Sequence, residues 1–476
     1  MNQTSSPPLG RILAGTILLF VTVYFCFSAG WKTTAALMIA IPAGFALILP
    51  VQQASQFLLY YLAMCFVVAD RTIYVGDYYR IYPQEVILFL LFPYVAFTQW
   101  KTPDKTLVPL SGKLLAVFTI IGVMTAVNYQ QPVDLAVFFA KGVLFFVPLF
   151  FCVRRVVTSE RVLQNVCLFL VVSTAVACAM SIADYHGLGI AKGVFGETEK
   201  DVLVDVRLED IYAFENPFHR IKGLHLFVTF TAASVYLTLF ISFYLYHAIK
   251  DQKLRLFLRL AQLSFLAYIF YSGYRSVWIA LAVSFAVYGI QRGAKGVVGF
   301  ALAGFLIISV LPAGATDRLR GLGISSEAER DSSVQKRIER AEGAMEIIRE
   351  KTLFGTGWGS AGLVHNEFLQ IAADSGIFTV IAFVVFYGGI LARLYRRYWQ
   401  SVRQGHRLES HCMNVFFCAL GGYLFVLFTG SHFNTQHTFI VFWLTLALAA
   451  KITNLPIGES AGTSVSRQVS PAVPTG

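Results

Sequence analysis

Fourteen long apolar stretches restrict what this chain can fold into more than any other feature. A bilayer core about 30 Å thick is crossed by roughly 20 mostly apolar helical residues. Stretches that approach this length, bounded by charges, Gly or Pro, cover residues 12–29, 33–50, 54–69, 84–99, 113–128, 134–153, 161–182, 223–248, 255–272, 276–291, 295–312, 377–395, 412–429 and 437–451. Only Pro50 to Gln53 separate the second stretch from the third. We therefore predict an all-α polytopic membrane protein with 12–14 transmembrane helices.

The composition excludes the alternatives to a membrane protein. Hydrophobic residues make up 56% of the chain and charged residues 14%, whereas a soluble domain has about a quarter charged residues. Disordered, collagen-like and coiled-coil chains are excluded by the same figures. The seven cysteines lie in or beside apolar stretches without the spacing of a zinc site, so we interpret them as small buried apolar side chains.

The basic residues indicate which loops share a side of the membrane. With the N-terminus inside and the first stretch retained as a span, short inner segments hold 20 of the 38 Lys and Arg residues, and short outer turns hold four. This asymmetry follows the positive-inside rule. Much of the net charge of +11 is thus a topology signal, and no nucleic-acid partner is expected.

The same topology divides the chain into six segments. Two polar loops are too long to be turns, and both are expected on the outer face, where a membrane enzyme would carry its chemistry. The tail is rich in Ser, Gly and Pro and is predicted to be disordered. The segments are N-terminal spans (1–183), a first outer loop (184–222), central spans (223–312), a second outer loop (313–376), C-terminal spans (377–453) and the tail (454–476).

His365 gives the strongest local signal for chemistry. It precedes an apolar span in the polar, glycine-rich segment GSAGLVHNEFLQ, so it is expected at the outer membrane boundary. An imidazole there can take a proton from an attacking hydroxyl near neutral pH. The alternative is a histidine that only hydrogen-bonds a helix end. Asn366 and Glu367 follow directly and could orient the ring or cap the next helix.

Arginines on the outer side form a second group of candidates. Arg275 lies in a short turn between two spans, and Arg220 ends the first outer loop. A guanidinium so close to hydrocarbon needs an anionic partner, and its planar donors suit phosphate oxygens. Residues 332–351 show apolar positions at helical spacing and predict an amphipathic helix on the membrane face. This helix carries Arg337 and Arg340. The alternative for Arg275 is snorkelling to ordinary headgroups, and the alternative for any one of these arginines is a solvated charge.

No catalytic role is predicted for the other polar groups. Lys141 lies inside a span and is expected to face a polar cavity or a carboxylate. The first outer loop is acidic but lacks the spacing of an EF-hand, so no metal site is expected. The sequence also lacks a Walker A motif, and no cofactor is predicted.

Four short motifs follow one another in the chain: HRIKG at 219–223, SGYRSVWIAL at 272–281, the helix and turn at 337–362, and HNEFLQIAADSGI at 365–377. Together and in this order they resemble the O-antigen ligase and polymerase family of bacterial lipopolysaccharide assembly. Two features depart from the family pattern. Thr352 stands where the family has a proline after the amphipathic helix, and no Pro-Asn pair follows the first motif.

The resemblance implies a membrane-embedded, GT-C-like glycosyltransferase. It implies an O-antigen ligase of the bacterial inner membrane, with its active site facing the periplasm and membrane lipids around it. The donor would be a glycan on undecaprenyl pyrophosphate, and the acceptor the lipid A-core. By this resemblance Arg220 and Arg275 bind the pyrophosphate without a metal, and His365 positions or deprotonates the acceptor. Substrate contacts are expected from Arg337, Arg340 and Asn366.

Two groups of alternatives remain open from the sequence. An O-antigen polymerase and a protein O-oligosaccharyltransferase would use the same donor and differ in the acceptor. A transporter for a lipid or an anionic solute is an alternative of another class, and it predicts pseudo-symmetric halves with broken helices. The sequence shows no such halves.

Overall fold

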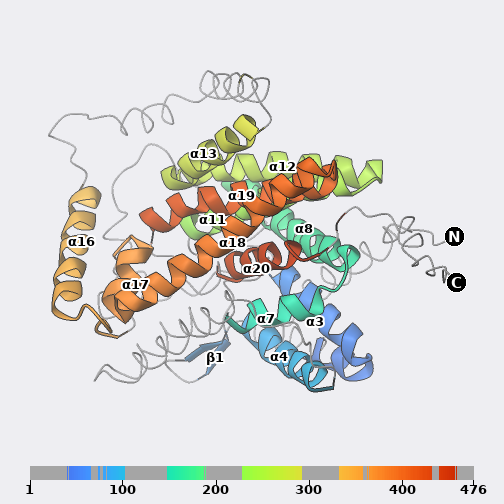
Figure 1. Cartoon of the computed structure of the whole chain (residues 1–476), viewed down its shortest axis with the longest axis horizontal. Helices are drawn as coiled ribbons and strands as arrows, with labels where there is room; N and C mark the ends of the chain where they lie inside the picture. The colour runs from blue at the N-terminus through green and yellow to red at the C-terminus, as the bar shows by residue number, and fades with distance from the viewer. Residues whose placement is uncertain are drawn as a thin grey trace, which may run out of the picture.

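The computed structural model (Figure 1) describes twelve helices and one hairpin. The residues that it describes are 40, 42–65, 73–75, 79–81, 83–101, 147–186, 188, 228–291, 298, 332–357, 362, 364–430, 439–455 and 457. The elements are α3 (Val51–Met64), β1 (Ile73–Val75), β2 (Tyr79–Ile81), α4 (Pro83–Lys101), α7 (Val147–Val156), α8 (Glu160–Tyr185), α11 (Val228–Ala248), α12 (Gln252–Ser272), α13 (Arg275–Gln291), α16 (Ser332–Glu350), α17 (Glu367–Ser375), α18 (Ile377–Arg403), α19 (Arg407–Thr429) and α20 (Phe439–Ile452).

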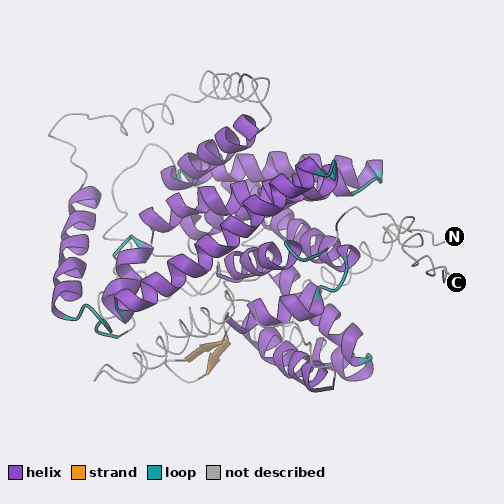
Figure 2. Cartoon of the chain, in the orientation of Figure 1, coloured by secondary structure: helices purple, strands orange, loops and turns teal. Residues whose placement is uncertain are grey.

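Helices dominate the described residues, as Figure 2 shows. Four of them, in α8, α12, α18 and α19, are long and apolar enough to cross a membrane, and three shorter apolar helices accompany them. The predicted class, a helical polytopic membrane protein, is confirmed. The predicted stretches 161–182, 255–272, 276–291 and 437–451 agree within three residues with α8, α12, α13 and α20. The stretches 12–29 and 113–128 lie outside the described residues, so the count of 12–14 spans stays a prediction.

A small antiparallel hairpin departs from the all-α prediction. Strands β1 and β2 pair with Ile73 opposite Ile81 and Tyr74 opposite Arg80. Branched and aromatic residues favour strands over helices, and the sequence here reads IYVGDYYRI. The topology predicted from the sequence has only a short turn between two spans here.

α19 lies at the centre of the described bundle and contacts α11, α13, α17, α18 and α20. It approaches α11 and α13 closely at Gly422. The hydroxyl oxygens of Tyr236 and Ser284 are 2.6 Å apart, and these hydroxyls donate to the carbonyls of Ala419 and Cys418, respectively, each at 2.8 Å. The missing side chain of Gly422 provides the room for these hydroxyls.

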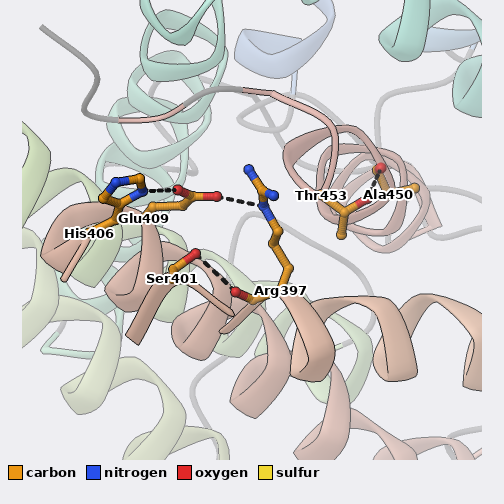
Figure 3. Close-up of polar contacts among 6 residues, drawn as sticks. All are labelled: Arg397, Ser401, His406, Glu409, Ala450 and Thr453. Atoms are coloured by element: carbon orange, nitrogen blue, oxygen red, sulfur yellow. Dashed lines mark hydrogen bonds and ion pairs between the residues drawn. The ribbon is translucent and has the colours of Figure 1, made fainter. Parts of the chain in front are cut away.

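The turn between α18 and α19 is held by a buried carboxylate (Figure 3). Glu409 is 2% exposed and accepts a hydrogen bond from Arg397 Nε at 2.6 Å, and His406 Nδ1 lies 3.2 Å from its other oxygen. The Ser401 hydroxyl donates to the carbonyl of Arg397. α18 itself extends as a helix to Arg403, beyond the predicted end of its span at residue 395.

Two helices lie at the opposite end of the bundle, where α18 begins. α17 leads directly into α18, and α16 runs crosswise to the long helices (Figure 1). α16 corresponds to the predicted amphipathic helix 332–351. It packs on α17 through a small apolar patch, which we name the α16–α17 patch, made of Ala344, Ile347, Ile348, Val364, Leu369 and Ala373. This end of the bundle carries the candidate site.

Candidate active site

α17 begins at a side-chain cap that fixes the backbone next to His365. The Asn366 Oδ1 accepts hydrogen bonds from the backbone N–H groups of Phe368 at 3.0 Å and Leu369 at 3.1 Å. Asparagine is a favoured N-cap because its oxygen satisfies N–H groups that have no partner within the helix. The capping role, one of the two considered for Asn366 from the sequence, is thus present, and His365 lies immediately outside the first turn of α17.

His365 has the left-handed backbone conformation, with φ of 58°. A residue other than glycine seldom adopts this conformation without anchoring on both sides. On one side Asn366 caps α17. On the other, the backbone N–H of Val364 donates to Gln370 Oε1 at 3.0 Å, and Gln370 Nε2 donates to Asp374 Oδ2 at 2.8 Å. Side chains of α17 thus hold the backbone on both sides of the imidazole.

The imidazole of His365 contacts an arginine of α16. Arg340 Nη1 lies 2.9 Å from His365 Nε2. A guanidinium carries only donors, so Nε2 must accept this hydrogen bond. The neutral imidazole then carries its proton on Nδ1. The structure therefore brings together two of the predicted site residues, Arg340 and His365, through one hydrogen bond.

Burial and two arginines keep His365 neutral. Burial lowers the pKa of His365 most, the nearby charges of Arg337 and Arg340 lower it further, and together they bring it to about 4. Arg337 is exposed and Arg340 is partly exposed. At neutral pH the imidazole can accept a proton, because its basic form dominates.

A clasp joins the loop after α16 to the end of α17. The backbone N–H groups of Thr356 and Gly357 donate to the carbonyls of Ala373 at 2.9 Å and Asp374 at 2.8 Å, and Ile377 N–H donates to Thr352 O at 2.9 Å. We call these three hydrogen bonds the clasp. It fixes the end of α16 relative to α17, and hence Arg340 relative to His365.

Two glycines allow the clasp to form. Gly355 and Gly376 have φ of 65° and 85°. A Cβ on Gly355 would lie 2.5 Å from Ala373 O, and one on Gly376 would lie 2.0 Å from Leu353 O. Only glycine suits both the backbone conformation and the close approach.

One face of α17 is polar and fully buried. Glu367, Gln370 and Asp374 have no exposed surface and share this face because they are three and four residues apart. Glu367 and Tyr274, from the turn before α13, both lie near Tyr423 of α19. Gln370 and Asp374 are not among the residues predicted from the sequence, although their helical spacing from Glu367 is a usable signal.

Arg275 is the first residue of α13 and lies next to Tyr274. The turn that presents it is rigid, because Trp278 stacks on Phe270 with an interplanar angle of 8° and its Nε1 donates to Ile269 O at 2.9 Å. Arg275 is partly exposed.

Several predicted residues lie outside the described part of the chain. Arg220, Lys141 and the acidic residues of the first outer loop are among them. The roles expected for Arg220 and Lys141 therefore stay predictions.

The fold and the site define a helical polytopic membrane protein with a histidine–arginine site at one end of its bundle. Residues 260–384 match the family model described as O-antigen ligase. The match extends from α12 into α18 and includes Arg275, Arg340 and His365. The resemblance predicted from the motifs is confirmed over these residues. No curated protein matches the chain.

Proposed function

We propose that this protein is an O-antigen ligase of the bacterial inner membrane. It transfers a glycan from undecaprenyl pyrophosphate to the lipid A-core at the periplasmic face. The observation that carries the proposal is the contact between Arg340 and His365, which falls inside the stretch that matches the O-antigen ligase family. A neutral histidine beside arginines, whose planar donors suit phosphate oxygens, fits transfer from a pyrophosphate to a hydroxyl group.

The arginines bind the donor in this proposal. Arg275 and Arg220 hold the pyrophosphate and neutralise the charge that develops as it leaves. Arg275 also stands at the N-terminus of α13, where backbone N–H groups and the helix dipole favour an anion. Guanidinium groups placed before the reaction stabilise this charge without a divalent cation, so the transfer is independent of metal.

His365 accepts the proton of the acceptor hydroxyl in this proposal. The acceptor oxygen attacks the anomeric carbon on the face opposite the pyrophosphate and forms the new glycosidic bond. The bond from this carbon to the phosphate oxygen breaks, and undecaprenyl pyrophosphate leaves with the electron pair. The hydroxyl proton passes to His365 Nε2, and the anomeric configuration inverts. His365 is in its basic form at neutral pH, so it can take this proton as the new bond forms.

Purified protein in lipid nanodiscs tests the proposal with lipid-linked glycan and lipid A-core. We expect His365→Ala to lower the transfer rate by about 10²–10⁴-fold, the usual contribution of a general base. Arg275→Ala and Arg220→Ala are expected to lower it as well, and excess EDTA to leave it unchanged. Arg407→Ala, an exposed arginine at the start of α19, is the control with unchanged rate.

The identity of the acceptor distinguishes the three kinds of transferase that use this donor. Glycan on the lipid A-core supports the ligase, whereas extension of a second lipid-linked glycan indicates a polymerase and glycan on a protein indicates an oligosaccharyltransferase. If the three variants all keep the full rate, the roles given to these residues are wrong.

A further inference from the structure

The lone pair of His365 is occupied by a hydrogen bond within the protein. Arg340 Nη1 lies 2.9 Å from Nε2, and the guanidinium is a permanent donor. A neutral imidazole has one basic nitrogen, and here that nitrogen accepts from Arg340. An acceptor hydroxyl can pass its proton to Nε2 only after this hydrogen bond is broken.

We infer that Arg340 masks His365 until the donor binds. The pyrophosphate draws the guanidinium away from Nε2 and so makes the base available. This inference rests on the proposed function. It makes Arg340 a positioning residue that couples the donor half of the site to the acceptor half, and the donor must then bind before the acceptor is activated.

The exchange of partners is favourable because phosphate oxygens carry charge. Hydrogen bonds from arginine to a phosphate are short, charge-assisted and often doubled, whereas the neutral imidazole offers one uncharged acceptor. Arg340 is partly exposed, so a phosphate at the surface of α16 can reach it. Arg337, one turn earlier on α16, is exposed and adds positive charge on the same side.

The backbone need not move for this exchange. Ala344, one turn after Arg340, is buried in the α16–α17 patch, and the clasp fixes the loop that follows α16. The several torsions of an arginine side chain allow its guanidinium to swing while α16 stays in place. The histidine stays in its anchored turn.

Labelling by diethyl pyrocarbonate measures whether Nε2 is accessible, since the reagent attacks an unprotonated imidazole nitrogen. At pH 8 His365 is neutral in every variant, so the rate reports access and not charge. In the protein without ligand we expect Arg340→Ala to label His365 faster, on the order of tenfold or more, because a hydrogen bond to a charged group no longer has to break. Peptide mass spectrometry gives the rate, with His406 as the internal reference.

Two matched variants separate masking from a structural effect. Arg337→Ala removes a neighbouring charge but no hydrogen bond to Nε2, and Arg340→Lys keeps a donor at the same position. Both are expected to label more slowly than Arg340→Ala. Equal labelling in the wild type and Arg340→Ala, with both proteins folded by circular dichroism, overturns the inference.

A second labelling experiment adds undecaprenyl pyrophosphate, which carries no glycan and therefore cannot donate one. Faster labelling of His365 in the wild type supports release by the pyrophosphate, and unchanged or slower labelling overturns it. Because labelling requires no transfer, its outcome is separate from that of the proposed function. Masking without any transferase activity contradicts the function alone, and transferase activity without masking contradicts this inference alone.

Discussion

At the scale of single residues, the protonation of His365 depends on its surroundings. The pKa falls to about 4 through burial and the charges of Arg337 and Arg340. A histidine ordinarily titrates near 6.5, so the folded protein binds fewer protons at His365 than the unfolded chain between these values. This histidine therefore contributes stability that is present at neutral pH and is lost as the pH falls from about 6.5 towards 4.

The pH at which kcat/KM falls on the acidic side of its profile tests the causes of the lowered His365 pKa. The pH dependence of kcat/KM reports the pKa of the base in the free enzyme. We therefore expect kcat/KM of the wild type to fall near pH 4. Arg337→Ala and Arg340→Ala each remove a positive charge, so each should move this fall to higher pH. Burial remains, so neither should reach the value of an exposed histidine. If kcat/KM of both variants falls at the same pH as in the wild type, the charges of Arg337 and Arg340 do not lower the pKa of His365.

Asn366 offers a second residue-scale test, because it caps α17 and was also predicted to contact substrate. Asn366→Ala removes the acceptor for Phe368 and Leu369 N–H, and we expect a loss of about 0.5–2 kcal/mol in the stability of this helix end. Asn366→Asp keeps a capping oxygen. If Asp restores both helix protection in hydrogen exchange and transfer, the cap explains the role; if Asp restores protection only, the amide also contacts substrate.

At the scale of elements, the clasp makes one unit of α16, its loop and α17. Gly355→Ala places a Cβ 2.5 Å from Ala373 O, and backbone atoms there cannot move cheaply. We expect a loss of about 1–3 kcal/mol, typical of overpacking, with faster amide exchange in α17. The control is Gly362→Ala, since Gly362 has a similar φ of 66° but open space around it. Equal effects of the two substitutions would mean that backbone strain, and not the close approach, is responsible.

The elements were largely predictable and their contacts were not. The periodicity of residues 332–351 indicated α16, and the apolar stretch from 377 indicated the start of α18. Periodicity reveals which face of a helix is apolar, but it does not identify the element that covers this face. Arg340 and His365 are 25 residues apart. The clasp that aligns them consists of backbone hydrogen bonds, and its two glycines do not show from the sequence which carbonyls lie against them.

At the scale of the whole molecule, the contact around Gly422 joins three helices. A Cβ on Gly422 would lie 2.0 Å from Ser284 Oγ and 2.3 Å from Tyr236 OH. Gly422→Ala is therefore expected to separate α19 from α11 and α13, and to lower the midpoint of thermal unfolding in detergent. Gly421→Ala is the matched control, because no atom lies within 4 Å of the Cβ position there. If both variants unfold at the same temperature as the wild type, this packing does not limit stability.

The class of the protein, a helical membrane protein, was predictable from the length of its apolar stretches and the distribution of its charges, because the bilayer constrains both. The hairpin of β1 and β2 was not, since three-residue strands are too short for a periodicity analysis. The buried contact of Glu409 with Arg397 was also missed. These residues were counted only as charges, and a count of charges does not show which of them pair.

The clasp limits where recombination can exchange this part of the chain without separating Arg340 from His365. Arg340, His365 and the clasp fall within one continuous stretch of the chain, residues 340–377. Recombination between related genes that replaces 332–377 as a whole transfers a matched arginine and histidine together. A crossover between residues 341 and 364 instead combines a foreign arginine with a resident histidine. Hybrid proteins of the first kind should keep the hydrogen bond between the two side chains, and those of the second kind should lose its alignment.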